Sequence, residues 1–156
     1  MSEFSIRRRI LGIDLGRARI GVAVSDELGM LAHPVETIPA RMDVAARIAE
    51  IVREKNAERV VIGLPRHMNG SVGIGAAEAL AFAEKLRARL SCEVVTWDER
   101  MSTMAANRAL RESGQKTRNS RSVVDQVAAQ MILQGYLDSL QAARGPDIEP
   151  GEAQRE

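Results

Sequence analysis

Two short apolar runs near the start of the chain alternate with small or polar residues at the period of β-strands. The first extends from Ile10 to Gly16 and the second from Ile20 to Asp26, and a short glycine- and arginine-containing turn separates them. A third extended run, from Leu31 to Ile38, contains Pro34, which lacks a backbone N–H and is therefore typical of an edge strand. Together the three runs predict an antiparallel meander.

Beyond the meander, the spacing of apolar residues alternates between that of helices and that of strands. The predicted elements are a helix over 43–55 capped by Asp43, a strand at 60–64, a helix over 76–90, a strand at 94–97, a helix from Ser102 to about Leu110, a Gly-, Lys- and Arg-rich loop at 112–119, and a last helix over 123–137. Because crossovers between parallel strands are right-handed, these elements predict an α/β fold. Its five-stranded mixed sheet has the order 3-2-1-4-5, with strand 2 antiparallel and helices on both faces.

The length and composition predict one globular domain. A chain of 156 residues forms a single core, which we place at residues 1–144, and the Gly-, Pro- and Glu-rich residues 145–156 predict a disordered tail. The net charge of +1 gives no overall attraction to nucleic acid, so an anion site must be a local basic patch. The single Cys92 excludes an internal disulfide and a cysteine-rich zinc site, and we interpret it as a buried structural thiol.

The amino terminus predicts a cytoplasmic protein. It contains no apolar stretch long enough for a signal-peptide core or a membrane span.

Acidic residues follow three elements whose ends should meet. Asp14 ends the first strand, Glu99 follows the fifth strand directly after Asp98, and Asp125 lies near the start of the last helix. In a sheet of this order, the carboxyl ends of parallel strands open at one edge, where ligands of α/β folds bind. Three carboxylates suit Mg²⁺ or Mn²⁺ better than zinc, and two such ions can activate water and stabilise the leaving oxygen of a phosphodiester. The pattern therefore predicts a nuclease.

Each acid also has a simpler structural interpretation. Asp14 could end its strand through a local hydrogen bond in the turn. Glu99 could be solvated, or paired with Arg100. Asp125 could complete a capping box with Ser122 at the start of the last helix. The nuclease prediction depends on all three acids meeting at the same edge.

Basic residues are concentrated in loops near this acidic edge, where they could hold phosphates by charge-assisted hydrogen bonds. They are Arg17, Arg19, Arg66, Arg100, Lys116, Arg118 and Arg121. The alternative for each is an ordinary solvated side chain. With one Trp and one Tyr, the chain favours recognition of the nucleic-acid backbone over stacking on bases. We interpret His33 and His67 as plain polar residues.

Five motifs in the chain resemble those of the YqgF/RuvX family of RNase H-like proteins, whose members are described as Holliday junction resolvases and as pre-16S rRNA nucleases. The resemblance extends from Ile10 to about Leu140. The motifs are Gly12-Ile13-Asp14-Leu15-Gly16, Ile20 to Asp26, Ile62-Gly63-Leu64-Pro65 with Asn69-Gly70, Asp98 to Thr103, and Val124 to Ala129. The family commonly has leucine at position 101 and often serine at 126, where this chain has Met101 and Gln126.

The resemblance implies a cytoplasmic hydrolase of nucleic acid that processes the 5′ end of the small-subunit rRNA precursor and meets ribosomal particles. The family's acidic residues correspond to Asp14, Glu99 and Asp125 here. Branched DNA is the other substrate that the family descriptions suggest, and a junction resolvase would act as a homodimer to cut two strands symmetrically.

Two other classes of protein remain open from the sequence. Sugar kinases and actin-like ATPases begin with a similar Asp-x-Gly hairpin, but they close two such domains around ATP and this chain supplies one. The other class is a catalytically silent nucleic-acid-binding module that has kept the fold.

Overall fold

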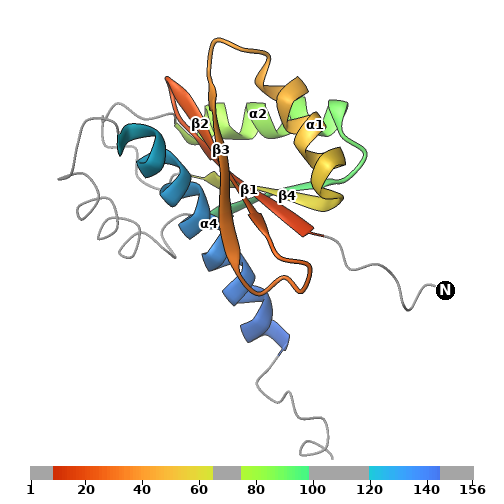
Figure 1. Cartoon of the computed structure of the whole chain (residues 1–156). Helices are drawn as coiled ribbons and strands as arrows, with labels where there is room; N and C mark the ends of the chain where they lie inside the picture. The colour runs from red at the N-terminus through yellow and green to blue at the C-terminus, as the bar shows by residue number, and fades with distance from the viewer. Residues whose placement is uncertain (1–8, 65–74, 99–119, 145–156) are drawn as a thin grey trace, which may run out of the picture.

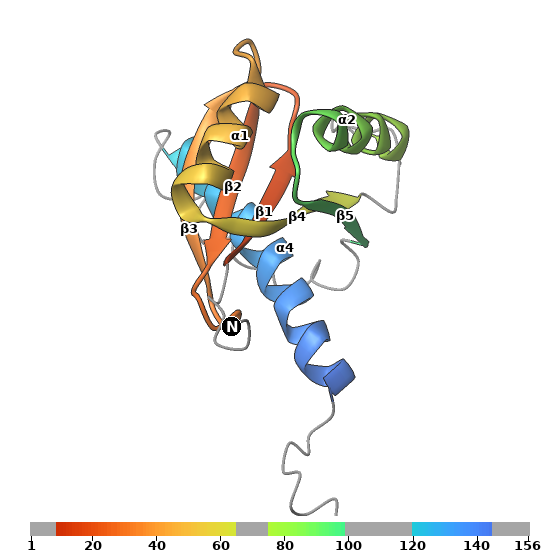
Figure 2. The same cartoon turned by 90° about the vertical axis from the view of Figure 1, so that its right-hand side faces the viewer.

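The computed structural model describes residues 9–64, 75–98 and 120–144, and for residues 120–125 and 144 it describes the backbone alone. In these ranges the chain forms β1 (Arg9–Leu15), β2 (Arg19–Ser25), β3 (Ala32–Pro39), α1 (Val44–Lys55), β4 (Ala57–Leu64), α2 (Ala76–Arg89), β5 (Glu93–Asp98) and α4 (Ser120–Arg144). Helices α1 and α2 cover one face of a single sheet, and α4 covers the other (Figures 1 and 2).

The sheet has the order β3-β2-β1-β4-β5. Strand β2 is antiparallel to β1 and to β3, whereas β4 is parallel to β1 and β5 is parallel to β4. The predicted strand order and directions are therefore confirmed. Pro34 lies in β3 at the edge of the sheet, where its missing N–H costs no ladder hydrogen bond.

The period of two along each strand sorts its side chains between two cores. In β1, Leu11 and Ile13 face α1 and α2, whereas Ile10 and Gly12 face α4. The first core includes Val22, Ile38, Ile48, Ile51, Val60, Ile62 and Leu86, and the second includes Ala23, Val61, Ala129, Leu133 and Leu137. Because both faces of β1 and β4 are covered, the central residues of these strands are apolar or glycine, and the charged residues lie toward their ends.

Helix α1 begins and ends at residues suited to those positions. The carboxylate of Asp43 accepts a hydrogen bond from the backbone N–H of Ala46 at 3.2 Å, which satisfies one of the free amides of the first turn. Asn56 ends the helix in the left-handed conformation, with φ of 56°. The predicted cap at Asp43 is confirmed.

Helix α4 packs directly on the backbone of β1 at Gly12. A Cβ atom added to Gly12 would lie 2.6 Å from Cβ of Leu133 and 3.3 Å from the carbonyl oxygen of Ala129. Glycine at this position therefore sets how closely the helix approaches the strand.

Glutamine side chains fasten α4 to β3. Nε2 of Gln126 donates to Oγ1 of Thr37 at 3.2 Å, near the end of β3. Gln130 donates to the carbonyl of Ala32 at 3.0 Å, and Gln134 accepts from the N–H of the same residue at 2.9 Å. The helix therefore runs antiparallel to β3, with its amino-terminal turns at the carboxyl end of that strand.

The structure corrects two details of the sequence-based prediction. Helix α4 already begins at Ser120, so Ser122 lies inside the helix and the capping-box interpretation of Ser122 and Asp125 is wrong. Strand β4 begins at Ala57, three residues before the predicted start at 60. The predicted helix at 102–110, the loop at 112–119 and the tail at 145–156 lie outside the described residues.

Substitution of Gly12 tests the close packing of α4. We expect Gly12→Ala to lower the free energy of unfolding by about 1–3 kcal/mol, because overpacking forces the helix off the strand. Urea denaturation measures the change. Gly29→Ala is the control. Gly29 has a φ of +71°, and no atom lies within 4 Å of a Cβ added there. This substitution should therefore lower the free energy of unfolding through backbone strain, without displacing α4. An unchanged urea midpoint for Gly12→Ala would contradict the packing role.

A half-buried ion pair between β3 and α1 makes stability depend on pH. Arg47 donates to both carboxylate oxygens of Glu36, at 2.9 and 2.7 Å, and this hydrogen bonding lowers the pKa of Glu36. Because the pKa is lower in the folded chain, the stabilisation is complete above the unfolded value of about 4.3 and is lost as pH falls through the folded value.

Glu36→Gln should therefore cost about 0.5–1 kcal/mol of unfolding free energy at pH 7, and the difference from wild type should shrink as pH falls below about 4. Denaturant unfolding at a series of pH values measures both effects. Glu84→Gln is the control, because Glu84 pairs with Arg87 at a more exposed position. This variant should change the free energy of unfolding little. Equal losses for the two variants, independent of pH, would contradict this account of Glu36.

Candidate functional site

The strand register places Asp14 in a row across the sheet with one residue from each of the other four strands. It pairs with Gly21 of β2, and Gly21 pairs with Thr37 of β3. On the other side, Ile13 pairs with Ile62, so Gly63 is the next residue of β4 at the level of Asp14, and Gly63 pairs with Trp97 of β5. We call this set of five residues the Asp14 row.

The Asp14 row faces α4. Asp14 is two residues from Gly12, so both lie on the same face of β1. Thr37 contacts Gln126 of α4, and Trp97 packs in the α4-side core with its ring 5.7 Å from that of Tyr136 in an edge-to-face arrangement. The neighbours of Asp14 on both sides are glycines. No side chain of the adjacent strands therefore fills the space beside the half-buried Asp14 carboxylate at this level.

The packing of α4 places the backbone of Asp125 at the level of the Asp14 row. Ala129 lies over Gly12, and Asp125 is four residues, or about one helical turn of 5.4 Å, nearer to the start of the helix. Two residues of β-strand span about 6.6 Å, so one turn of α4 matches the step from Gly12 to Asp14. The side chain of Asp125 lies outside the described residues.

Strand alternation separates Asp98 from this face. Val95 and Trp97 pack in the α4-side core, whereas Val94 belongs to the core under α1 and α2. Asp98 follows Trp97 and pairs with Leu64, and it therefore points to the α2 side of the sheet. Asp98 shares the sheet edge with Asp14 but not its face. Glu99 lies outside the described residues.

The part of the chain that the structure describes contains no group of three or more His, Cys, Asp or Glu residues close enough to hold a metal. Of the three predicted metal ligands, it includes the side chain of Asp14 alone. That carboxylate fits a hard divalent cation, because it is an oxygen donor and its neighbours in the adjacent strands are glycines.

Two of the predicted phosphate-binding residues, Arg17 and Arg19, have side chains that the structure describes. Arg17 is exposed in the turn after β1, and Arg19, half-buried, begins β2. The turn is tight: a Cβ atom on Gly16 would lie 2.5 Å from the carbonyl oxygen of Arg19. Arg17, three residues after Asp14 in the sequence, belongs to this tight turn. The side chains of Arg66, Arg100, Lys116, Arg118 and Arg121, and His67, lie outside the described residues.

Two other titratable residues, His33 and Cys92, lie away from the Asp14 row. His33 is exposed, and Cys92 is a free, partly buried thiol packed against the core under α1 and α2. Desolvation raises the pKa of Cys92, which disfavours the reactive thiolate.

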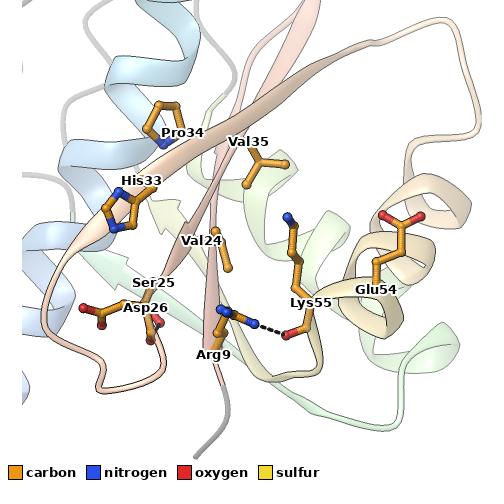
Figure 3. Close-up of a pocket in the computed structure, with 9 residues that line it drawn as sticks. All are labelled: Arg9, Val24, Ser25, Asp26, His33, Pro34, Val35, Glu54 and Lys55. Atoms are coloured by element: carbon orange, nitrogen blue, oxygen red, sulfur yellow. Dashed lines mark hydrogen bonds between the residues drawn. The ribbon is translucent and has the colours of Figure 1, made fainter.

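A hollow of about 550 Å³ lies at the opposite end of the sheet, where β1 begins (Figure 3). Arg9 and Lys55 contribute positive charge to its lining, and Asp26 and Glu54 balance that charge. Nη1 of Arg9 is already engaged with the carbonyl oxygen of Lys55. The hollow therefore offers no net attraction to phosphate, and it is remote from the Asp14 row.

Gly21, Gly63, Thr37 and Gln126 were not singled out from the sequence as site residues. Gly21 could have been found by writing out the register of the β1–β2 hairpin, since the short turn after Gly16 fixes which residue faces Asp14, whereas the register of Gly63 depends on a long crossover. The contact of Thr37 with Gln126 joins residues 89 apart in the chain, and no local pattern indicates it.

No helix in the described ranges is long and apolar enough to cross a membrane.

Comparison with known proteins gives close relatives over most of the chain. A protein of Acetivibrio thermocellus is 47% identical over 135 residues, which are 84% of this chain and 96% of that protein. A protein of Nocardia farcinica is 50% identical over 145 residues, 87% of this chain and 81% of that protein. Both are named "Putative pre-16S rRNA nuclease".

Two solved structures share the fold at low sequence identity. Thermus thermophilus RuvC in complex with a Holliday junction substrate has a TM-score of 0.59 and 16% identity, and covers 88% of this chain and 96% of its own. The Fowlpox virus resolvase in complex with Holliday junction DNA has a TM-score of 0.51 and 12% identity, with 85% and 98% covered. At these identities the likeness shows the RNase H-like fold.

The family comparison covers nearly all of the sheet and α4. A family model described as "RuvX: Holliday junction resolvase" matches residues 8–139, a range that includes the Asp14 row and the positions of Glu99 and Asp125. The chain therefore belongs to the RuvX (YqgF) family.

Proposed function

We propose that this protein is an endonuclease that uses Mg²⁺ or Mn²⁺ bound by Asp14, Glu99 and Asp125, and that it matures the 5′ end of 16S rRNA. The observation that carries the proposal is the position of Asp14 between two glycines, at the level where α4 brings the backbone of Asp125 over the sheet. Membership of the family makes the protein a hydrolase of nucleic-acid phosphodiester bonds.

In this proposal the carboxylates bind the divalent ions. Asp14 stands on a rigid, covered strand, so its position is fixed before any ligand arrives. Divalent ions bound there would activate water and stabilise the leaving oxygen. The neighbours of Asp14 in β2 and β4 are glycines, so no side chain of those strands at this level would compete with the ions for the carboxylate.

Strand alternation argues against Asp98 as the third acid, and we therefore propose Glu99 from the segment after β5. Trp97 is on the α4 face of β5 and Asp98 is on the other, so Asp98 does not share the face of Asp14. Strand β5, which ends at Asp98, is two strand spacings, or about 10 Å, from β1. In this proposal Glu99 reaches back across β4 to share a metal with Asp14, and Gly63, the residue of β4 at the level of Asp14, carries no side chain.

Arginine side chains hold the substrate in this proposal. Arg17 is exposed three residues from Asp14, where its guanidinium can hold a phosphate next to the one that is cut. Arg66, Arg100, Lys116, Arg118 and Arg121 belong to the same predicted basic surface. Since the chain has one Trp and one Tyr, we infer that it reads backbone and shape more than bases.

Precursor rRNA is the substrate that the relatives favour. The proteins that are 47% and 50% identical over most of their lengths are named for pre-16S rRNA, whereas the junction-resolving structures share 16% identity or less. We place the reaction in the cytoplasm, on precursor ribosomal particles. Branched DNA is the second candidate, because the matching family model is described as a Holliday junction resolvase, and it would require a homodimer.

Asp14→Asn tests the assignment of the metal site. The substitution keeps the shape of the side chain and removes its charge, so cleavage should fall at least about 100-fold while the unfolding midpoint is retained. Cleavage of a labelled rRNA leader with Mn²⁺ measures the activity. Asp98→Asn is the matched control, because Asp98 lies at the same edge on the other face, and it should cleave like wild type.

Equal activity of Asp14→Asn and wild type, with contaminating nuclease excluded by a second purification, would refute the site. Loss of activity in Asp98→Asn alone would refute the choice of face.

A side-by-side assay distinguishes the two substrates. We expect the protein to cut a pre-16S rRNA leader with a higher kcat/KM than a four-way DNA junction at equal Mn²⁺. Symmetric cutting of the junction by a dimer, with the leader left intact, would replace the rRNA proposal with the resolvase. Binding of the leader with no cleavage under any Mg²⁺ or Mn²⁺ concentration would indicate a silent binding module.

A further inference from the structure

We propose that the hydrogen bond from Gln126 to Thr37 positions the metal site, by holding the turn of α4 that carries Asp125 at a fixed height above Asp14. The inference rests on the proposed function. It deepens that function by assigning a role to two residues that supply no metal ligand.

The two residues of this contact lie close to the proposed ligands in the helix and in the sheet. Gln126 is adjacent to Asp125 in α4, and Thr37 belongs to the Asp14 row. The contact is 3.2 Å long and half-buried. It therefore links the helix to the sheet at the level of the Asp14 carboxylate.

Gly21 explains why such a link is useful at this level. It lies between Asp14 and Thr37 and presents no side chain toward α4. At the level of the proposed metal site, β2 therefore gives the helix no side-chain support. Thr37, one strand further out, supplies that support through its hydroxyl.

The other glutamines of α4 provide an internal comparison. Gln130 donates to the carbonyl of Ala32, and Gln134 donates to the carbonyl of Met30. These contacts fasten the same helix to the first residue of β3 and to the segment just before it, away from the Asp14 row. They should stabilise the fold without fixing the turn that carries Asp125.

The expected effect on metal binding follows from geometry. Ligands must be held within about 0.5 Å of their productive positions, and loss of a residue that orients a ligand typically lowers metal affinity about 10- to 100-fold. Loosening the turn of α4 that carries Asp125 would lower Mn²⁺ affinity by this route even if the fold were retained.

The experiment compares Gln126→Ala and Thr37→Val with the control Gln130→Ala and the conservative variant Thr37→Ser. Mn²⁺ titration of metal-free protein by calorimetry gives the affinity without relying on cleavage. Trp97, the single Trp of the chain, belongs to the Asp14 row, so quenching of its fluorescence by Mn²⁺ gives a local readout. The unfolding midpoint is measured for every variant.

We expect Gln126→Ala and Thr37→Val each to weaken Mn²⁺ binding at least about tenfold. The double variant should bind Mn²⁺ no more weakly than either single variant, because both substitutions remove the same contact between Gln126 and Thr37. Gln130→Ala should lose thermal stability and bind Mn²⁺ like wild type. Thr37→Ser keeps the hydroxyl and should also bind like wild type.

Several results would overturn the inference. Equal Mn²⁺ affinities for Gln126→Ala and wild type, or equal losses for Gln126→Ala and Gln130→Ala, would show that the contact supports the fold alone. Failure of Thr37→Ser to retain binding would remove the hydroxyl as the cause. Asp14→Asn separates the two levels of the argument: if it binds Mn²⁺ like wild type, the proposed metal site itself is wrong and the inference fails with it.

Discussion

Helix α4 reaches the backbone of β1 because Gly12 has no side chain, and the rest of the candidate site depends on that contact. The helix crosses the sheet with Ala129 and Leu133 against the strand, and a single added methyl group would collide with Leu133. One turn of helix and two residues of strand cover nearly the same distance. The contact at Gly12 therefore sets the distance between the helix backbone at Asp125 and the carboxylate at Asp14.

This arrangement combines two requirements that conflict in most proteins. A tightly packed interior excludes water and leaves no empty volume, whereas a site for ions and phosphate needs open space beside a charge. Here Gly21 and Gly63 leave the Asp14 row without side chains next to the acid, and Ala23, two positions after Gly21, and Val61, two positions before Gly63, close the core beneath it. The acid can thus stand at the end of a buried strand without being sealed inside.

Much of the sheet could be predicted from the sequence because its signals are local. Alternating runs gave the strands of the meander, Pro34 marked the edge, and the handedness of crossovers ordered the rest. Asp14 was identifiable because an acid ending an apolar strand needs a reason to be there. The start of α4 was misplaced since a Ser-x-x-Asp pattern carries no information about whether a helix has already begun upstream. Likewise, the contacts of Gly12 with Leu133 and of Thr37 with Gln126 join distant parts of the chain, and they exist only once the fold has formed.

The glutamine contacts at the start of β3 have a consequence for the behaviour of the protein at high concentration. An outer strand normally exposes backbone N–H and C=O groups that a strand from another molecule can pair with. At Ala32 both groups are occupied, the N–H by Gln134 and the carbonyl by Gln130, and Pro34 has no N–H to offer. Side-chain amides thus take the place of a sixth strand, and this margin of the sheet is protected against the intermolecular strand addition that begins aggregation.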